Sequence, residues 1–339
     1  MPRKALSGFL CRLTATCGVL TALAAPSYAL DSIKVNYVEP APYYAPLFLA
    51  IDKGYFKDEG IAAELVQAGG GVATPALLAG DLDFSTSGSV AISAILKGAK
   101  LKVLFVTSDR PAFELWAQPE IKSIEDLKDK PVGIISRGDT SEIAMRYYLV
   151  KHNHPGDFVA YTPLGTGTGR LAGIASGAYA AALLGVNEME ELKASGKFQT
   201  QHQLADMTKD VRMVFSGLAA SDALIAKNPD LVRRMLRAFV KGMHHTQASK
   251  EDSVAAMVAH GNGDASKAAA QYDSSAGLLS STGKTALGAE AFELQLRGDL
   301  LSVPKDQIKK PEQVFDFHFV DKVSAELKAE NWKPKIGKP

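Results

Sequence analysis

The chain has 339 residues, of which 46% are hydrophobic and 22% are charged, and its formal net charge at pH 7 is +1. At about 150 residues per domain this length suggests two domains, and the composition is typical of a folded protein rather than a disordered one. The sequence has no basic block of the kind that binds nucleic acid and no run of like charges that would form a tail.

The first 29 residues differ from the rest and predict a secretory signal peptide. A basic start, Arg3–Lys4, precedes the apolar, small-residue stretch Ala5–Ala25, and Ser27–Ala29 places small residues at both positions that a signal peptidase recognises. A membrane anchor is the alternative, but the uninterrupted apolar run is shorter than the roughly 20 residues that span a bilayer. We therefore expect a periplasmic protein, cleaved near Ala29.

The mature chain is expected to contain no cysteine, because Cys11 and Cys17 both lie in the signal peptide. This excludes a disulfide framework, thiol nucleophiles and cysteine metal sites. Five histidines show no HExxH spacing, so we predict no metal site and no cofactor; they are His152, His154, His244, His245 and His260.

Short strands alternate with helical segments over two blocks of the chain, about Leu30–Asp109 and Arg110–Val214. The expected strands are Ile33–Val38, Ala62–Gln67, Leu82–Ser85, Lys102–Thr107, Glu114–Trp116, Pro131–Ile135, Phe158–Thr162 and Ala181–Leu184. Such alternation predicts βαβ units and mostly parallel sheets. From Ser221 onward the sequence is nearly all helical. Two α/β lobes would leave a cleft between them, which is a preferred place for a small-molecule site.

The loops at the expected strand ends supply hydroxyls, glycines and aromatic rings, but no acid–base pair for catalysis. This composition suits a polar ligand that is held without reacting. Gly69–Gly71 has no lysine at the phosphate-loop position, and Gly165–Gly169 does not match the dinucleotide fingerprint. The candidate ligand residues are Tyr43, Tyr44, Ser87, Gly88, Ser108, Ser136, Arg137, Gly138, Thr140, Ser141, Thr166 and Asn187.

One stretch, Ser136–Ser141, combines features that suit an anion. Thr140 or Ser141 is expected to begin a helix, whose first N–H groups have no intrahelical partners. Gly138 allows close approach, and Arg137 adds a planar donor for carboxylate or sulfonate; Arg170 is the second arginine candidate. Asp139 opposes this hypothesis, because it would repel an anion and could itself cap the helix.

Five motifs appear in one order along the chain: GYFKDEGI at 54–61, LLAGDLDF at 77–84, LKGAKLKVL at 96–104, IEDLKDKPVGI at 124–134 and NPDLVRRMLRAF at 228–239. In these five motifs and their order, the chain resembles the periplasmic substrate-binding proteins of ABC importers for nitrate, sulfonates, taurine and thiamine pyrimidine precursors. The resemblance implies a two-lobed type II binding fold, with lobe 1 at 30–109 plus 220–339, lobe 2 at 110–219, and the helical C-terminal part packed on lobe 1.

The resemblance also implies a function and partners. We expect a monomer that binds a small polar solute, an organic anion such as a sulfonate or carboxylate, and delivers it to a membrane permease. A neutral heteroaromatic, such as a thiamine pyrimidine precursor, is the alternative ligand, and a sensor subunit of a membrane receptor is the alternative role. An enzyme on the same scaffold is disfavoured, because the sequence offers no acid–base set.

Overall fold

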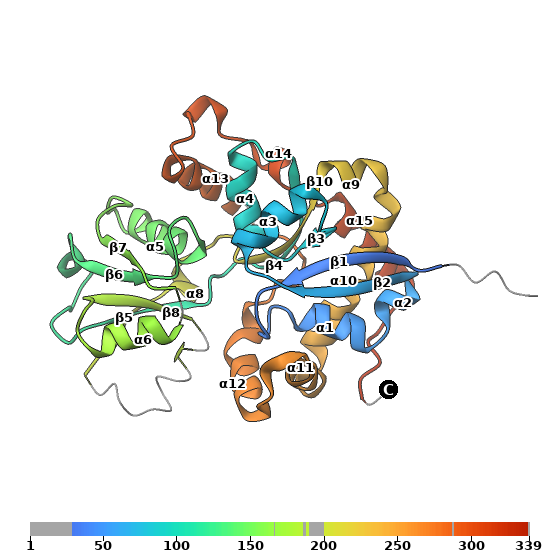
Figure 1. The fold of residues 1–339 in the computed structure, drawn as a ribbon, viewed down its shortest axis with the longest axis horizontal. Helices are drawn as coiled ribbons and strands as arrows, with labels where there is room; N and C mark the ends of the chain where they lie inside the picture. Colours follow the sequence, from blue (N-terminus) through green and yellow to red (C-terminus); the bar gives the residue numbers. More distant parts are fainter. Residues whose placement is uncertain (1–28, 166, 186–187, 190–199, 287, 338–339) are drawn as a thin grey trace, which may run out of the picture.

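The computed structural model describes residues 29–165, 167–185, 188–189, 200–286 and 288–337. Residues 1–28 of the expected signal peptide lie outside this range. The described residues form two α/β lobes (Figure 1), and each lobe is built around a sheet that has five strands. No helix among them is both long enough and apolar enough to cross a membrane.

The first sheet has the strand order β2-β1-β3-β10-β4. Its strands are β1 (Asp31–Tyr37), β2 (Ile61–Gln67), β3 (Phe84–Ser85), β4 (Leu101–Ser108) and β10 (Ser216–Ser221). β1 pairs in parallel with β2 and β3, whereas β10 is antiparallel to both β3 and β4. The sheet is therefore mostly parallel, and its one antiparallel strand is the segment that returns from the other lobe.

The second sheet repeats this plan, with the order β7-β6-β8-β5-β9. Its strands are β5 (Phe113–Ala117), β6 (Pro131–Ile134), β7 (Ala160–Pro163), β8 (Ala181–Gly185) and β9 (His202–Asp206). Here the arriving strand, β5, is antiparallel to β8 and β9. The short edge strand β9 was not expected, because its sequence HQLAD is polar and lacks the β-branched residues that mark strands.

The chain crosses between the lobes twice, and the two crossings are hydrogen-bonded to each other. The N–H of Phe215 donates to the carbonyl of Ser108 at 2.9 Å, and the N–H of Met213 donates to that of Asp109 at 2.9 Å. The family resemblance implies crossings at 110–112 and at about 216–220. In the structure the second segment forms β10, which begins at Ser216 and lies between β3 and β4 in the first sheet.

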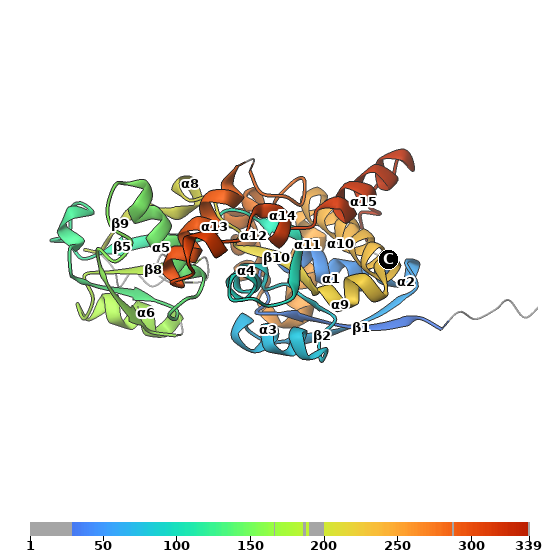
Figure 2. The ribbon, with the colours of Figure 1, turned by 90° about the horizontal axis from the view of Figure 1, so that it is seen from above.

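The helices flank the sheets and, after β10, form most of the remaining chain (Figure 2). They are α1 (Ala45–Asp52), α2 (Tyr55–Asp58), α3 (Gly70–Ala79), α4 (Gly88–Leu96), α5 (Thr140–Lys151), α6 (Gly167–Ala175), α8 (Met207–Asp210), α9 (Asp222–Lys227), α10 (Pro229–Ala248), α11 (Lys250–Met257), α12 (Ala265–Ser275), α13 (Ala289–Leu300), α14 (Pro311–Val314) and α15 (His318–Ala329).

The longest helix, α10, packs against α1 in the core of the first lobe. Its start is encoded locally: Asn228 accepts a hydrogen bond from the N–H of Leu231, and Pro229 occupies the first helical position. Gly242 makes the close packing possible, because a Cβ atom there would lie only 2.0 Å from the carbonyl oxygen of Pro46. One cluster of buried apolar side chains runs from the first lobe into the second, where it includes Leu171, Ile174 and Leu184, and another cluster lies in the second lobe.

The helical C-terminal part packs on the first lobe, as expected, and one of its helices, α13, also reaches the second lobe. α13 lies beside α4 of the first lobe and also contacts α5 of the second lobe. At the second contact the rings of Phe292 and Tyr147 meet edge to face, with their centroids 4.7 Å apart. The partly buried Leu296 and Leu300 also pack against the core of the second lobe. α13 therefore bridges the two lobes.

The C-terminal tail is held by a carboxylate with several donors. The Asp252 carboxylate accepts from His245 at 2.7 Å, Lys53 at 3.0 Å and the N–H of Gly337 at 3.2 Å. Burial alone would raise the pKa of Asp252, but these hydrogen bonds outweigh it and lower the pKa from 3.8 to about 2.

A lowered pKa in the folded state adds stability above the unfolded pKa, and this stability is lost as the pH falls through the folded value. We expect Asp252→Asn to lower the free energy of unfolding at pH 7, with the difference from wild type shrinking between pH 4 and pH 2. Urea titrations across this range measure it. Asp273→Asn, in an exposed pair with Lys250, is the control and should change little. A constant Asp252 effect across the range would contradict this account.

Candidate ligand-binding site

A cavity of about 400 Å³ lies between the lobes and is lined by residues from both. In the first lobe its wall comes from the loops after β1 and β3 and from the start of α3; in the second it comes from the start of α5, the helix α6 and the end of β8. The second crossing also contributes, through Phe215 and Ser216. This volume is within the usual range for a small-molecule site.

A fully buried asparagine on β1 positions the loop after β3. The amide oxygen of Asn36 accepts the N–H of Thr86 at 3.1 Å, and its amide nitrogen donates to the Ser87 hydroxyl at 3.3 Å. The Thr86 hydroxyl donates in turn to the backbone carbonyl of Asn36 at 2.8 Å. Both Thr86 and Ser87 line the cavity as a result.

Gly88 was expected to contact ligand, but it does not line the cavity. It instead lets the start of α4 pack against β10, because a Cβ atom at this position would lie 2.9 Å from the carbonyl oxygen of Gly217. Its role in the structure is close backbone packing. Ser87 is the residue that precedes α4, so Ser89 lies in the first turn of the helix.

The first turn of α5 is satisfied by its own side chains. Asp139 caps the helix by accepting the N–H groups of Ser141 at 3.0 Å and Glu142 at 3.2 Å, and it also accepts the Ser141 hydroxyl at 2.6 Å. Glu142 accepts the N–H of Gly138 at 2.6 Å. Burial raises the pKa of the Asp139 carboxyl although these hydrogen bonds lower it. Thr140 and Ser141 are therefore not the cap, and the N–H groups expected to bind an anion are occupied.

Arg137 does not line the cavity, although it was expected to bind ligand. Its guanidinium donates to the carbonyl of Tyr161 at 2.7 Å and pairs with Glu142 at 3.3 Å, and its side chain is 57% exposed. Ser108 also lies outside the cavity wall, where its buried hydroxyl lies 2.8 Å from the carbonyl oxygen of Leu278. Both residues serve contacts within the protein.

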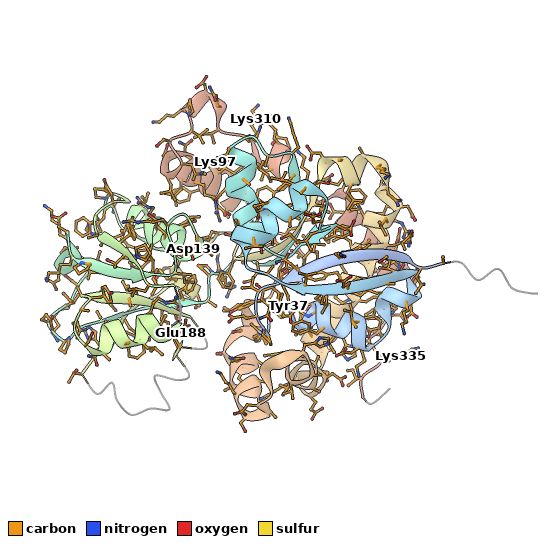
Figure 3. All side chains as sticks on the ribbon, in the orientation of Figure 1. Tyr37, Lys97, Asp139, Glu188, Lys310 and Lys335 are labelled. Carbon is orange, nitrogen blue, oxygen red and sulfur yellow. The ribbon has the colours of Figure 1, made fainter. Side chains whose placement is uncertain are left out.

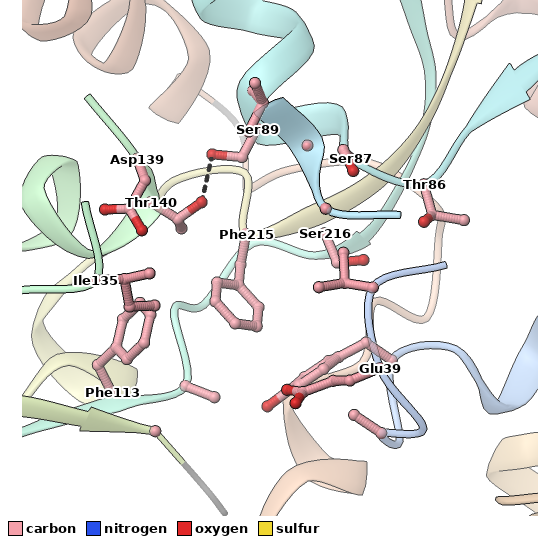
Figure 4. Close-up of a pocket in the computed structure, with 18 of the residues that line it drawn as sticks. Glu39, Thr86, Ser87, Ser89, Phe113, Ile135, Asp139, Thr140, Phe215 and Ser216 are labelled. Carbon is pink, nitrogen blue, oxygen red and sulfur yellow. Dashed lines mark hydrogen bonds between the residues drawn. The ribbon is translucent and has the colours of Figure 1, made fainter. Parts of the chain in front are cut away.

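Aromatic side chains from three parts of the chain meet at the cavity. The Phe215 ring lies edge to face with Phe113, at 5.6 Å between centroids (Figure 4), and it lies edge to face with Tyr43 at 4.9 Å. Tyr44 also lines the cavity. Phe215 and Tyr44 are only partly buried, so both offer aromatic surface to a ligand. Burial raises the pKa of the Tyr43 and Tyr44 hydroxyls, which stay neutral.

Carboxylates outnumber cations on the cavity wall. Glu39, Asp139 and Glu188 line it, and Arg170 is the one cationic side chain among the described lining residues. Arg170 is itself paired with Glu188 and donates to the carbonyl of Gly165 at 2.9 Å. Figure 3 shows Asp139 and Glu188 on the side of the second lobe that faces the first. The described residues of the wall therefore carry a net negative formal charge.

Two polar atoms in the wall have no hydrogen-bond partner among the described residues. They are Nε of Arg170, which is 3% exposed, and the hydroxyl of Ser216, which is 4% exposed. Buried polar groups are nearly always paired in folded proteins. Because both residues line the cavity, a bound molecule is the natural partner for these two groups.

The structure thus brings together five of the residues expected from the sequence: Tyr43, Tyr44, Ser87, Ser136 and Thr140. It places five others outside the wall: Gly88, Ser108, Arg137, Gly138 and Ser141. The remaining two, Thr166 and Asn187, lie outside the described residues.

Sequence reasoning did not select Phe113, Phe215, Glu39 or Glu188. For Phe113 and Phe215 a signal was present, because each adjoins a lobe crossing, and crossings border the cleft of a two-lobed protein. Glu39 and Glu188 adjoin loops that were selected for their tyrosines and Asn187.

Comparison with known proteins agrees with this architecture. Residues 41–253 match the family described as NMT1/THI5 like. The chain belongs to this family. It is 30% identical over 243 residues to a binding protein of Brucella abortus, a match that covers 68% of this chain and 72% of the relative. It is also 25% identical over 240 residues to the riboflavin-binding protein RibY of Chloroflexus aurantiacus, covering 68% of this chain and 66% of RibY.

Solved structures share the fold at lower identity. The periplasmic aliphatic sulphonate binding protein SsuA of Escherichia coli superposes with a TM-score of 0.66 at 18% identity, covering 83% of this chain and 94% of SsuA. The periplasmic nitrate-binding protein NrtA of Synechocystis PCC 6803 gives 0.66 at 13% identity, covering 88% and 90%. The two-lobed periplasmic binding protein fold is therefore established for this chain, and the relatives are binding proteins rather than enzymes.

The cap of α5 provides a test of the site's electrostatics. Asp139→Ala should lower the free energy of unfolding by about 1 kcal/mol, because the first N–H groups of α5 lose their acceptor. It should also raise the affinity for anions such as sulfate, because the mutation removes a cavity carboxylate and frees those N–H groups. Denaturant unfolding and sulfate titration measure the two effects. Asp264→Ala removes the cap of α12, away from the cavity, and should affect stability alone. Unchanged sulfate binding in Asp139→Ala would contradict the assignment.

Proposed function

We propose that this protein is the exported, monomeric substrate-binding component of an ABC importer, and that its solute is a heteroaromatic compound without an anionic group. The observation that supports this choice of solute is the excess of carboxylates on the wall of an aromatic cavity. As part of the proposal we keep the division into lobe 1, at 30–109 plus 220–339, and lobe 2, at 110–219, with the solute held between them.

Electrostatics disfavour the organic anion expected from the sequence. Two like charges 4 Å apart repel by about 4 kcal/mol at an effective dielectric constant of 20. Glu39, Asp139 and Glu188 line the cavity and would repel a sulfonate or carboxylate, and the Arg170 guanidinium already balances one of them. The likeness to sulfonate- and nitrate-binding proteins supports the fold, but their identities of 18% and 13% do not extend to the ligand.

A planar heteroaromatic solute suits the rest of the wall. Tyr44 and Phe215 offer rings for stacking, and the unpartnered Nε of Arg170 and the Ser216 hydroxyl offer hydrogen bonds to ring nitrogens or carbonyl oxygens. RibY, a relative at 25% identity, is named as a riboflavin-binding protein, and riboflavin has a fused heteroaromatic ring system without an anionic group. The alternative ligand from the sequence, a thiamine pyrimidine precursor, belongs to the same chemical class.

The decisive experiment is a binding panel on the mature protein. We expect riboflavin, lumichrome or 4-amino-5-hydroxymethyl-2-methylpyrimidine to raise the melting temperature, since a ligand at 100 times its dissociation constant adds about 2.7 kcal/mol of stability. Taurine, methanesulfonate and nitrate should give no shift. Calorimetric titration then gives the dissociation constants.

Two variants sharpen the panel. Phe215→Ala should weaken binding of a heteroaromatic solute, because it removes a ring from the wall, whereas Arg137→Ala should leave the affinity unchanged, because its guanidinium lies outside the cavity. Selective binding of taurine or nitrate, lost in Arg137→Ala, would reverse the proposal and restore the anion hypothesis.

A further inference from the structure

A fully buried arginine contacts a serine in the cavity wall. Arg297, on α13, donates from Nη2 to the hydroxyl of Ser89 at 2.7 Å and from Nη1 to the backbone carbonyl of Ser89 at 3.0 Å. Ser89 lines the cavity and is only 2% exposed. A guanidinium has five donors and no acceptor, so the Ser89 hydroxyl can only accept from it.

The same serine contacts the opposite lobe across the cavity. The Thr140 hydroxyl, at the start of α5, donates to the Ser89 hydroxyl at 3.2 Å, as the dashed line in Figure 4 shows. A hydroxyl has two acceptor positions and one proton. Arg297 and Thr140 fill both acceptor positions of Ser89, so its own proton must be donated elsewhere. No acceptor among the described residues receives it.

This conclusion does not depend on how the shared proton is assigned. If Ser89 donates to Thr140 instead, then the proton of Thr140 is the one without an acceptor, and Thr140 also lines the cavity. In either arrangement the Ser89–Thr140 pair has one hydroxyl proton that no described group accepts. The arginine is responsible, because it prevents Ser89 from directing its proton toward α13.

We propose that Arg297 is a positioning residue that makes the Ser89–Thr140 pair a hydrogen-bond donor for a carbonyl oxygen or ring nitrogen of the solute. The inference rests on the proposed function and names the chemistry of one edge of the solute. Because Ser89 belongs to one lobe and Thr140 to the other, an acceptor bound at this point contacts both lobes at once.

The arginine is held in place without leaving a net charge near the cavity. Its Nε and Nη2 lie 2.8 Å and 2.6 Å from an oxygen of Glu293, and both side chains are fully buried. The other oxygen of Glu293 accepts the N–H of Val214 at 2.9 Å, in the second crossing. The charge of Arg297 is therefore balanced inside the protein. What reaches the cavity is a hydroxyl dipole, which suits an uncharged acceptor.

The chain offers a matched control in the same helix. Nη1 of Arg297 also donates to the hydroxyl of Ser93 at 3.1 Å, and Ser93 does not line the cavity. Ser89→Ala and Ser93→Ala thus each remove one serine hydroxyl, and each loses one hydrogen bond from the Arg297 guanidinium to that hydroxyl. Only the first removes a hydroxyl that can reach a solute.

The test is calorimetric titration of the mature protein and its variants with riboflavin, lumichrome and 4-amino-5-hydroxymethyl-2-methylpyrimidine. Ser89→Ala and Thr140→Val should each weaken binding roughly three- to tenfold, the range for loss of a neutral hydrogen bond. Ser93→Ala should change the dissociation constant less than twofold. The double variant, Ser89→Ala with Thr140→Val, should bind the solute with about the same affinity as the single variant that binds less tightly, because the two hydroxyls together supply one donor.

A second readout separates positioning from simple structural support. Arg297→Lys keeps a buried donor for Ser89 and should bind the solute more tightly than Arg297→Met at matched pH. If Arg297→Met does not fold, the dissociation constants of Ser89→Ala and Thr140→Val still test whether the Ser89–Thr140 pair donates to the solute. Equal affinities for Ser89→Ala and Ser93→Ala would overturn the inference and leave the proposed function standing. If none of the three compounds binds the wild-type protein, then the proposed function fails, and this inference with it.

Discussion

The two lobe crossings lie side by side, and the rest of the site depends on that constraint. Backbone hydrogen bonds join residues 213 and 215 to 109 and 108, so the chain leaves and re-enters the first lobe at one point. Each crossing then becomes an antiparallel strand in its new sheet, β5 or β10. The side chains next to the crossings, Phe113, Phe215 and Ser216, must therefore meet at the cavity, although Phe113 and Phe215 are 102 positions apart in the sequence.

The polar groups around the cavity divide into those that the protein satisfies and those that it leaves open. Asp139 uses its carboxylate on the first turn of α5, and Glu293 uses its own on Arg297 and Val214. Hydrogen-bond donors stabilise each of these buried carboxylates, because a buried carboxylate without a partner would lower the free energy of unfolding by about 3–5 kcal/mol. The groups left open are the Arg170 Nε, the Ser216 hydroxyl and the proton of the Ser89–Thr140 pair. All of these lie on the cavity wall, which is where unsatisfied groups in a binding protein can gain partners.

The sequence predicted the architecture well, because strands and helix caps leave local signals. Eight of the strands, the two blocks and the helical C-terminal part follow from apolar periodicity. The site was harder, because loop composition does not say which way a side chain points. Arg137 and Ser141 lie in the expected stretch, but both bond within the second lobe. Arg137 donates to the carbonyl of Tyr161 and pairs with Glu142, and the Ser141 hydroxyl donates to Asp139. That competition depends on neighbours brought in by tertiary structure, which no local pattern reports.

The position of Phe215 connects ligand chemistry to the crossing itself. Its ring packs edge to face on Tyr43 of the first lobe and Phe113 of the second, while its backbone N–H donates a hydrogen bond to the carbonyl of Ser108. Edge-to-face packing leaves a ring face available, and the partial exposure of Phe215 lies on the cavity. A flat solute that stacks there contacts both lobes through one side chain in the second crossing. An anion suits this wall less well, because Glu39, Asp139 and Glu188 line it, whereas Arg170 is the one cation among its described residues.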